Sequence, residues 1–440
     1  MGTKKLLIAA IVLAALSGVL WWSNQHPDWG KDKKDEPEAT PALLTVADAS
    51  LAGIDIQKKD GSRVSLERKS GKWAITAPAA YPADQDAATS IASALAPANA
   101  DSVVESKPSD VSKYGLITPS VLVTVHEKGG RTDQLTFGDD VPGGSMVYVR
   151  VSGNPKVYAA PTSLKTSFDK GLNDLRDKRL LTFDQGQLTR IALLSGKTNI
   201  EFGKNGQSEW TIVQPQPYRA DNFQVEELLR KLNDAKMDLS AAAADTEKAQ
   251  HSFASGKPVA TVKLTDSTGT QTFDVRKNGD DYFGKSSVVD GAYKLTAEIG
   301  KQLEKSLDDF RNKKLFDFGF SDPTRIEIQQ GTSTRTFSRA GNDWKMDGKT
   351  MDSAGVQGLV DQLRELSASK FASDGFTTAA ASIAIVSNDG KRTEKAEFSK
   401  TADGYLARRG AEPGLYQLDA KALNDILEAS TKVKPAASKK

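Results

Sequence analysis

A repeated motif with a basic half and an apolar half organises this chain. It reads RDKRLLTF at Arg176–Phe183 and returns as RNKKLFDF at Arg311–Phe318, 135 residues later. The tripeptide TRI returns after the same 135 residues, from Thr189–Ile191 to Thr324–Ile326. Self-similarity at a fixed period is typical of a repeat architecture. We therefore expect several copies of one folding unit.

Each copy carries a tryptophan after a glycine-containing turn. These are Trp73 in ERKSGKW, Trp210 in GKNGQSEW and Trp344 in SRAGNDW. Apolar and polar residues alternate on both sides of each turn, which predicts a half-buried β-hairpin. The tryptophans share the parity of the apolar positions, so we expect them in the core. The alternative is that they line a ligand groove.

An aspartate precedes a predicted helix in each copy. Asp84 follows Tyr81–Ala83, Asp221 follows Tyr218–Ala220, and the third copy has Asp352. After Asp221 and Asp352, apolar residues recur at i, i+3, i+4 and i+7, which predicts an amphipathic helix. Aspartate at this place accepts hydrogen bonds from the first turn, so we expect three N-caps rather than acid–base catalysts.

The second half of each copy opens with an aromatic residue, Tyr114, Phe253 or Phe376, and continues in alternating segments that predict a meander. A closing helix is expected through Leu164–Leu175 and, 135 residues later, through Ile299–Phe310. Each copy is thus an α+β unit, an antiparallel sheet with two packed helices. The expected organisation is repeat domains at 46–184, 185–319 and 320–433, followed by a solvated basic tail at 434–440, for which contact with an anionic surface is the alternative.

The N-terminus predicts a membrane anchor at residues 1–22. Lys4 and Lys5 precede the seventeen uncharged residues Leu6–Trp22, which as a helix would span about 26 Å, near the lower limit for a bilayer. The positive-inside rule then places the N-terminus in the cytoplasm and the bulk of the chain on the periplasmic or extracytoplasmic side of the cytoplasmic membrane. The alternative is a signal peptide cleaved after Ser17. Residues 23–45, with their prolines and charges, are expected to be a flexible linker.

Composition excludes several classes of function. The 440 residues include 59 Lys and Arg against 57 Asp and Glu, a net charge of +2, so we expect no nucleic-acid partner. Cysteine is absent, which removes disulfides, thiolate metal sites and thiol catalysis. The three histidines, His26, His126 and His251, leave little for histidine chemistry.

A search for catalytic motifs finds only weak candidates. The GKT segments at 196–198 and 348–350 lack the first glycine of a phosphate loop. Asp139 and Asp140, in the glycine-rich run 138–144, suggest calcium, but their spacing is not that of an EF-hand and an ordinary strand connection is expected. His126 lies in a predicted strand, and no serine has the G-x-S-x-G context. We therefore assign no catalytic, cofactor-binding or metal-ligating residue and expect no cofactor.

The basic runs Arg176–Arg179 and Arg311–Lys314 are expected to end the predicted closing helices. Positive charge at a helix C-terminus complements the helix dipole, which is the structural interpretation. A repeated contact with an anion or a polysaccharide is the alternative.

Taken in order, several motifs resemble the bacterial domain-of-unknown-function 4340 family. They are the N-terminal anchor, GKW at 71–73, YPAD at 81–84, YGL at 114–116, FGDD at 137–140 and YVR at 148–150. Copies two and three depart from the pattern, with Phe253 in place of the tyrosine and Ala381 in place of the proline. The resemblance implies an exported, membrane-anchored protein, accessory to an ABC transport system similar to those of gliding motility, with permease and auxiliary subunits as partners. It supplies no catalytic residue.

We therefore expect a transmembrane helix followed by three tandem α+β repeats that act as a non-enzymatic extracytoplasmic scaffold. The second hypothesis is a module that binds cell-envelope polymer, peptidoglycan or polysaccharide, which exposed aromatic platforms would support. The third is a glycan-acting hydrolase, which requires two carboxylates about 5–10 Å apart across a cleft.

Overall fold

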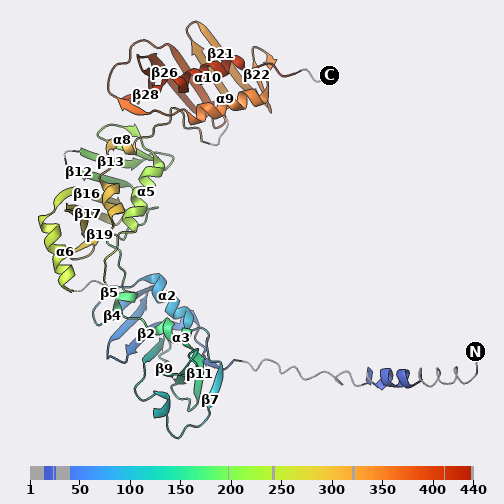
Figure 1. Cartoon of the computed structure of the whole chain (residues 1–440), viewed down its shortest axis with the longest axis vertical. Coiled ribbons are helices and arrows are strands. Elements are labelled where there is room, and N and C mark those ends of the chain that lie inside the picture. Colours follow the sequence, from blue (N-terminus) through green and yellow to red (C-terminus); the bar gives the residue numbers. More distant parts are fainter. Residues whose placement is uncertain are drawn as a thin grey trace, which may run out of the picture. The chain divides into compact units, whose positions relative to one another are not determined.

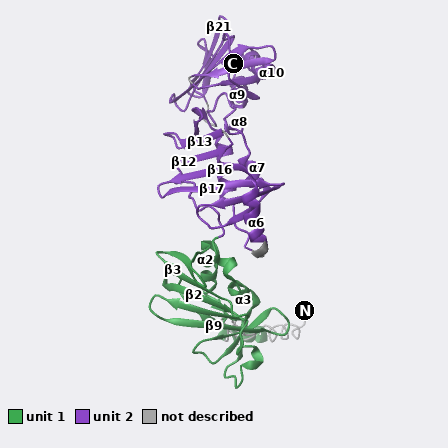
Figure 2. Ribbon diagram, turned by 90° about the vertical axis from the view of Figure 1, so that its left-hand side faces the viewer, with its two compact units in different colours: residues 1–177 green, residues 178–440 purple. Residues whose placement is uncertain are grey.

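The computed structural model describes residues 14–22, 24–25, 40–196, 198–239, 243–319, 323–410 and 412–437. The described residues form two compact units, divided between Asp177 and Lys178 (Figure 2). Unit 1 contains one large antiparallel sheet, and unit 2 contains two (Figure 1).

The sheet of unit 1 has, among the described residues, nine strands in the order β5-β4-β3-β2-β8-β9-β10-β11-β7. The strands are β2 (Leu51–Lys58), β3 (Arg63–Lys69), β4 (Lys72–Ala77), β5 (Tyr81–Pro82), β7 (Ser102–Glu105), β8 (Val121–Glu127), β9 (Thr132–Asp140), β10 (Met146–Val151) and β11 (Val157–Pro161). A separate ribbon pairs β1 (Ala42–Leu44) with β6 (Ala98–Asn99). The helices are η1 (Asp48–Ser50), α2 (Gln85–Ala94), η2 (Ser112–Tyr114), α3 (Thr162–Phe168) and α4 (Leu172–Leu175).

The first sheet of unit 2 runs β15-β14-β13-β12-β16-β17-β18-β19. Its strands are β12 (Arg190–Ser195), β13 (Thr198–Lys204), β14 (Trp210–Gln214), β15 (Tyr218–Arg219), β16 (Lys257–Asp266), β17 (Gly269–Asn278), β18 (Asp281–Ser286) and β19 (Ala292–Leu295). Its helices are α5 (Asn222–Asn233), α6 (Ala243–Ser255), α7 (Ala297–Leu303) and α8 (Leu307–Phe310).

The second sheet of unit 2 runs β23-β22-β21-β20-β25-β26-β27-β28-β24. Its strands are β20 (Arg325–Gln330), β21 (Ser333–Ala340), β22 (Asp343–Met346), β23 (Lys349–Thr350), β24 (Lys370–Ala372), β25 (Ala381–Ser387), β26 (Arg392–Lys400), β27 (Gly404–Arg409) and β28 (Leu415–Asp419). Helices α9 (Ser353–Glu365) and α10 (Ala420–Lys432) contact one another.

The three sheets share one plan. In each, two antiparallel meanders are joined along their first strands, β2 with β8, β12 with β16 and β20 with β25. This confirms the α+β class and the antiparallel sheets. Two details differ from the prediction. A short strand, β5, β15 or β23, lies between each tryptophan hairpin and the capped helix, where the sequence predicted none. The closing helix of the first two sheets, expected as one helix, is a pair of short helices, α3 with α4 and α7 with α8.

The tryptophans and the aspartates take the places expected for them. Trp73, Trp210 and Trp344 are 3%, 6% and 5% exposed and belong to three separate apolar cores. The carboxylates cap the helices that follow, because Asp84 accepts from the amides of Asp86 and Ala87, Asp221 from that of Gln224, and Asp352 from that of Gly355. The core and N-cap interpretations are confirmed.

The repeated basic and apolar motif straddles the boundary between copies. Leu180, Leu181 and Phe183 pack in the second core, and Leu315, Phe316 and Phe318 pack in the third. The boundaries expected at 184/185 and 319/320 therefore fall too late, because the apolar half of each motif enters the core that follows it.

Two further expected boundaries need correction. The linker at 23–45 ends earlier than expected, since β1 pairs with β6 and buries Leu43 and Leu44 in the first core. The tail at 434–440 begins later than expected, since the carbonyl of Lys434 accepts from Asp352 N at 2.8 Å and Ala436 N donates to the carbonyl of Thr350 at 2.9 Å.

The same backbone pairing ends every copy. In unit 1, Asp84 N donates to the Leu175 carbonyl and Asp177 N donates to the Pro82 carbonyl. In unit 2, Asp221 N donates to the Phe310 carbonyl, and Asn312 N donates to the Arg219 carbonyl. The segment leaving the closing helix thus runs antiparallel to the short strand before the capped helix.

The expected membrane anchor is only partly described. Of the predicted span Leu6–Trp22, residues 14–22 are helical and exposed, and residues 6–13 lie outside the described residues, as do His26 and residues 27–39 of the linker. Among the residues that are described, no helix has both the length and the apolar character needed to cross a bilayer.

In unit 1, the YGL and FGDD motifs pack against each other. A Cβ on Gly138 would lie 2.0 Å from the carbonyl oxygen of Tyr114, and a Cβ on Gly115 would lie 2.4 Å from Cγ of Asp139. Gly115 also has a φ of 68°, which favours glycine. The Tyr114 hydroxyl donates to Glu105 in β7 at 2.6 Å and holds the turn against the sheet. These motifs therefore have a structural role here.

Candidate functional site

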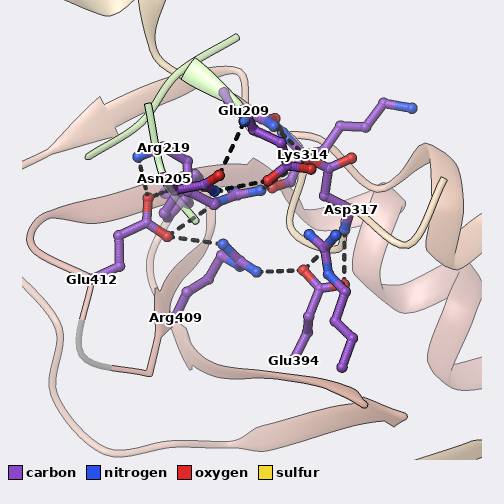
Figure 3. A network of polar contacts seen from close by, with 11 residues as sticks. Asn205, Glu209, Arg219, Lys314, Asp317, Glu394, Arg409 and Glu412 are labelled. Carbon is purple, nitrogen blue, oxygen red and sulfur yellow. Dashed lines mark hydrogen bonds and ion pairs between the residues drawn. The ribbon is translucent and has the colours of Figure 1, made fainter. Parts of the chain in front are cut away.

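A network of buried charges joins the two sheets of unit 2 (Figure 3). Arg409, at the end of β27, donates to Glu394 in β26 at 2.6 Å and to Glu412 at 2.9 Å. The side chains of Arg409 and Glu394 are only 10% and 5% exposed. The amide of Asp317 also donates to both oxygens of Glu394, at 3.0 and 3.1 Å.

Arg219 brings the other sheet into this network. It lies in β15, and its Nε donates to Glu412 at 3.2 Å while a guanidinium nitrogen donates to the hydroxyl of Tyr416 at 3.2 Å. The same guanidinium also donates to the carbonyl of Lys314. The matching residue of the first copy is Pro82, which has no side-chain donor. The residue that links the first sheet of unit 2 to the network therefore differs between the first and second copies.

An arginine stacks on a tyrosine at the end of the first copy and again at the end of the second. The Arg176 guanidinium lies 4.2 Å from the ring centre of Tyr81, and that of Arg311 lies 4.0 Å from Tyr218. Arg311 also lies 3.6 Å from the ring centre of Phe371 in β24, so it is held between both sheets of unit 2. Arg176 and Arg311 are C-cap residues of α4 and α8, where the helix dipole favours positive charge.

The rest of each basic run is an extended connector and not the end of a helix. Met237 N donates to the Lys178 carbonyl and Leu180 N to the Ala235 carbonyl. In the same way, Leu315 N donates to the Leu366 carbonyl. The expectation that the basic runs end the closing helices is wrong for all but the first residue of each run, because α4 and α8 end before the second residue.

The ionisation of Glu412 follows from its neighbours. Burial acts to raise its pKa, but the charge of Arg219, the hydrogen bond from Tyr416 and the charge of Arg409 outweigh burial and lower the pKa below its ordinary value of 4.5. A general acid for glycoside hydrolysis needs the opposite, a raised pKa. Glu412 is therefore suited to holding the junction together and not to donating a proton.

This lowered pKa predicts acid sensitivity of unit 2. Below pH 4.5 the unfolded chain binds a proton at Glu412 that the folded chain still excludes, so stability is present above pH 4.5 and falls as pH falls through the lower folded-state pKa. We expect Glu412→Gln to flatten this part of the curve of unfolding free energy against pH, measured by urea denaturation between pH 7 and pH 3. The exposed Glu365→Gln is the control and should leave the curve unchanged. Equal slopes for Glu412→Gln and the wild type would contradict the assignment.

A cleft of about 560 Å³ lies beside the network. Trp210 of β14, Arg219 of β15 and Asn222 at the start of α5 line it on one side, and Asp317 and Arg392 line it on the other. Several of these polar groups already have partners within the fold. Asn222 Oδ1 accepts from Trp210 N at 2.8 Å, and Arg392 lies 3.4 Å from Glu394. The lining suits a polar ligand, but much of its hydrogen-bonding capacity supports the junction.

Unit 1 brings together a second polar cluster on adjacent strands. His126 Nε2 in β8 lies 3.1 Å from Asp55 Oδ2 in β2, and the Thr132 hydroxyl lies 3.4 Å from His126 Nδ1. Asp55 is shared with Arg63, at 2.8 Å. Burial acts to raise the pKa of Asp55, but hydrogen bonds from Ser65 and His126 and the charge of Arg63 lower it overall. Sequence reasoning missed the cluster, since only strand pairing brings Asp55 beside His126.

The remaining sequence candidates are separate from both clusters. Asp140 pairs with Lys165 at 2.6 Å, and Asp139 packs against Gly115. No group of three or more metal-ligating side chains gathers anywhere in the described part of the chain. Gly348, with a φ of 75°, lies in the turn between β22 and β23 and so belongs to a hairpin, not a phosphate loop. His251 is exposed on α6, and Lys197 of the other GKT segment lies outside the described residues.

Comparison with known proteins identifies a family. The model of a family described as "Domain of unknown function (DUF4340)" matches residues 73–211 and again residues 210–384. Each match begins at a hairpin tryptophan, Trp73 or Trp210, and not at the first strand of a sheet. Each match to the family model therefore begins within one copy and ends within the next. No curated protein matches this chain, and no solved structure matches it.

Proposed function

Because this chain belongs to the DUF4340 family, we propose that it is a non-enzymatic, membrane-anchored extracytoplasmic scaffold, accessory to an ABC transport system. The observation that supports a scaffold best is the junction inside unit 2. Arg311 stacks on rings from both sheets, and Arg219 reaches Glu412 and Tyr416 across it. Such a junction holds two sheets as one compact body, which a protein needs if it is to present fixed surfaces to partners.

The proposed anchor is the segment Leu6–Trp22, preceded by Lys4 and Lys5. The folded part of unit 1 begins at Ala42, because β1 is paired and its leucines are buried. In this proposal, residues 23–41 connect the bilayer to unit 1, and both units lie on the extracytoplasmic side.

A second candidate function is binding of cell-envelope polymer. The polar cleft beside Trp210 supports it, since amide, carboxylate and guanidinium groups are the partners that sugar hydroxyls use. The burial of the three tryptophans weakens it, since these rings are not exposed platforms. A glycan-acting hydrolase is the third candidate, and the lowered pKa of Glu412 argues against that carboxylate as its acid.

Site-specific crosslinking in cells tests the scaffold proposal. A photoreactive phenylalanine analogue at Phe223, which is 70% exposed, and separately at Ile117, which is 66% exposed, reports on the surfaces of unit 2 and unit 1. The same analogue at the buried Phe202 is the control. We expect the exposed positions to capture permease or auxiliary subunits, identified by mass spectrometry of the membrane fraction. Capture of envelope polymer without protein would favour the second candidate and contradict the first.

A further inference from the structure

The cleft of about 560 Å³ in unit 2 has a polar lining that the junction does not use completely. Its volume lies within the range of about 300–1,000 Å³ that is usual for small-molecule sites. Such sites are mostly lined by apolar side chains, whereas carboxamides are prominent in this one. They belong to Asn205, Gln207, Asn222, Asn312 and Asn388. The lining therefore suits a ligand that forms many hydrogen bonds.

Two hairpin turns, one from each sheet of unit 2, line this cleft. The turn between β13 and β14 contributes Gln207 and Glu209, and the turn between β25 and β26 contributes Asn388 and Lys391. The first turn is held by Asn205, whose Oδ1 accepts from the backbone N–H groups of Gln207 and Glu209 at 2.9 and 3.0 Å. A lining that is already ordered loses little conformational entropy when a ligand binds.

Some polar groups of the lining have no partner within the described part of the chain. The side chains of Gln207, Asn388 and Lys391 form no hydrogen bond or ion pair with the described residues, and all three are exposed. The Asn222 side chain accepts from Trp210 N through Oδ1, at 2.8 Å, and its Nδ2 has no partner among the same residues. These four side chains can therefore bind a ligand without breaking a contact of the fold.

The free amide of Asn222 is particular to the second copy. The matching residue of the first copy is Gln85, which also follows the capping aspartate. Gln85 accepts from Trp73 N at 2.9 Å, and its Nε2 donates to the carbonyls of Trp73 and Ala83, both at 2.9 Å. The third copy has Ser353 at this position. Asparagine keeps the bond to the tryptophan N–H and leaves its NH₂ group at the cleft.

The charges of the lining indicate an uncharged ligand. Both signs are present, with three basic and two acidic side chains, Arg219, Lys391, Arg392, Glu209 and Asp317. A small anion would lie near two carboxylates, and a small cation would lie near three basic groups. Hydroxyl groups both donate and accept, so a ligand rich in hydroxyls can use all of these side chains and the carboxamides as well.

We propose that this cleft binds an uncharged oligosaccharide, whose hydroxyls form hydrogen bonds with the free groups of Gln207, Asn222, Asn388 and Lys391. The inference rests on the second candidate function and deepens it, by naming the site, the copies that build it and the charge of the saccharide. It leaves the scaffold role intact, since none of these four side chains takes part in the contact between Arg219 and Glu412.

A glycan array tests the proposal with the full chain. The array carries uncharged oligosaccharides, among them chito- and malto-oligosaccharides, beside uronic-acid oligosaccharides of the same lengths. We expect binding to at least one uncharged glycan, and salt up to about 0.5 M should leave it unchanged, because no charge pair forms. Binding to no uncharged glycan would overturn the proposal. Binding to uronic acids alone, weakened by salt, would identify an anion site instead and also overturn it.

Substitutions then test whether the glycan binds in the cleft. Gln207→Ala and Lys391→Met each remove one free group from one of the two hairpin turns. Each should weaken binding several-fold in isothermal titration calorimetry, with no change in melting temperature, because neither side chain supports the described fold. Lys391→Gln retains a donor and should bind more tightly than Lys391→Met. The control is Gln329→Ala, at an exposed position of β20 that does not line the cleft.

The double variant Gln207→Ala with Lys391→Met gives the decisive comparison. If it bound the glycan as tightly as the wild type, the assignment of the site to this cleft would be overturned. The polymer-binding candidate would then stand with its site elsewhere on the protein. The assay contains no transporter component, so its failure is also distinct from a failure of the crosslinking test.

Discussion

Replacing Arg409 with methionine is expected to lower the free energy of unfolding of unit 2 by about 3–5 kcal/mol. The guanidinium lies between Glu394 and Glu412, at 2.6 and 2.9 Å, and the side chain of Glu394 is only 5% exposed. Without Arg409, Glu394 remains as a carboxylate removed from water with much of its compensating charge lost. Urea denaturation of the full chain measures the effect, and hydrogen exchange assigns it to unit 2.

The neighbouring residue offers a matched control. Arg408 is on the same strand, but its side chain is 53% exposed and its pair with Glu397 is at the surface. Arg408→Met should therefore cost less than about 1 kcal/mol. The double replacement Arg409→Met with Glu394→Met should recover much of the loss, since a buried ion pair can often be replaced by apolar side chains. Equal effects of Arg409→Met and Arg408→Met would show that the network is hydrated and does not hold the junction.

The sequence predicts the regular parts of the fold because local chemistry determines them. A tryptophan at an apolar position of a hairpin is expected to be buried, as Trp344 is. An aspartate before an apolar helix is expected to cap it, as Asp352 does. The ends of the copies could not be predicted in this way, because Leu180 and Leu315 lie within one repeated motif and only the tertiary fold shows which core each enters.

The junction between the two sheets of unit 2 is harder to predict from the sequence than the repeats are. Glu412 and Arg219 are far apart in the chain, and their ion pair exists only because two sheets meet. One signal was available: Arg219 stands where the first copy has Pro82, so an aligned position changes from a residue without a side-chain donor to a charged one. The α6 segment gave no such signal, since its weak apolar pattern predicts neither an edge strand nor a packed helix.

Trp210→Ala is expected to destabilise the first sheet of unit 2 by about 3–5 kcal/mol, since it empties a large volume in a packed core. Trp210 is 6% exposed and belongs to the same apolar cluster as Phe202 and Ile212. The backbone N–H of Trp210 also donates to Oδ1 of Asn222 at the start of α5, at 2.8 Å, so the loss of stability should extend to that helix. Hydrogen exchange should show lost protection in β13, β14 and α5, with less change in β25 and β26.

Phe223→Ala is the control for Trp210→Ala. It shows whether the loss of stability comes from the core position of the ring or from the removal of an aromatic ring at any position. Phe223 is one residue after Asn222 and is 70% exposed, so its removal should change stability by less than about 0.5 kcal/mol. If Trp210→Ala were equally mild, the ring would not be part of the core. Trp210 would then be expected to act in the cleft that it lines. That result would favour the polymer-binding module over the scaffold. The expected result is a large loss of unfolding free energy in Trp210→Ala and no change in Phe223→Ala. That result would mean that the tryptophan at which each family match begins belongs to the core of a folding unit. Function must then be sought on the surfaces of these units.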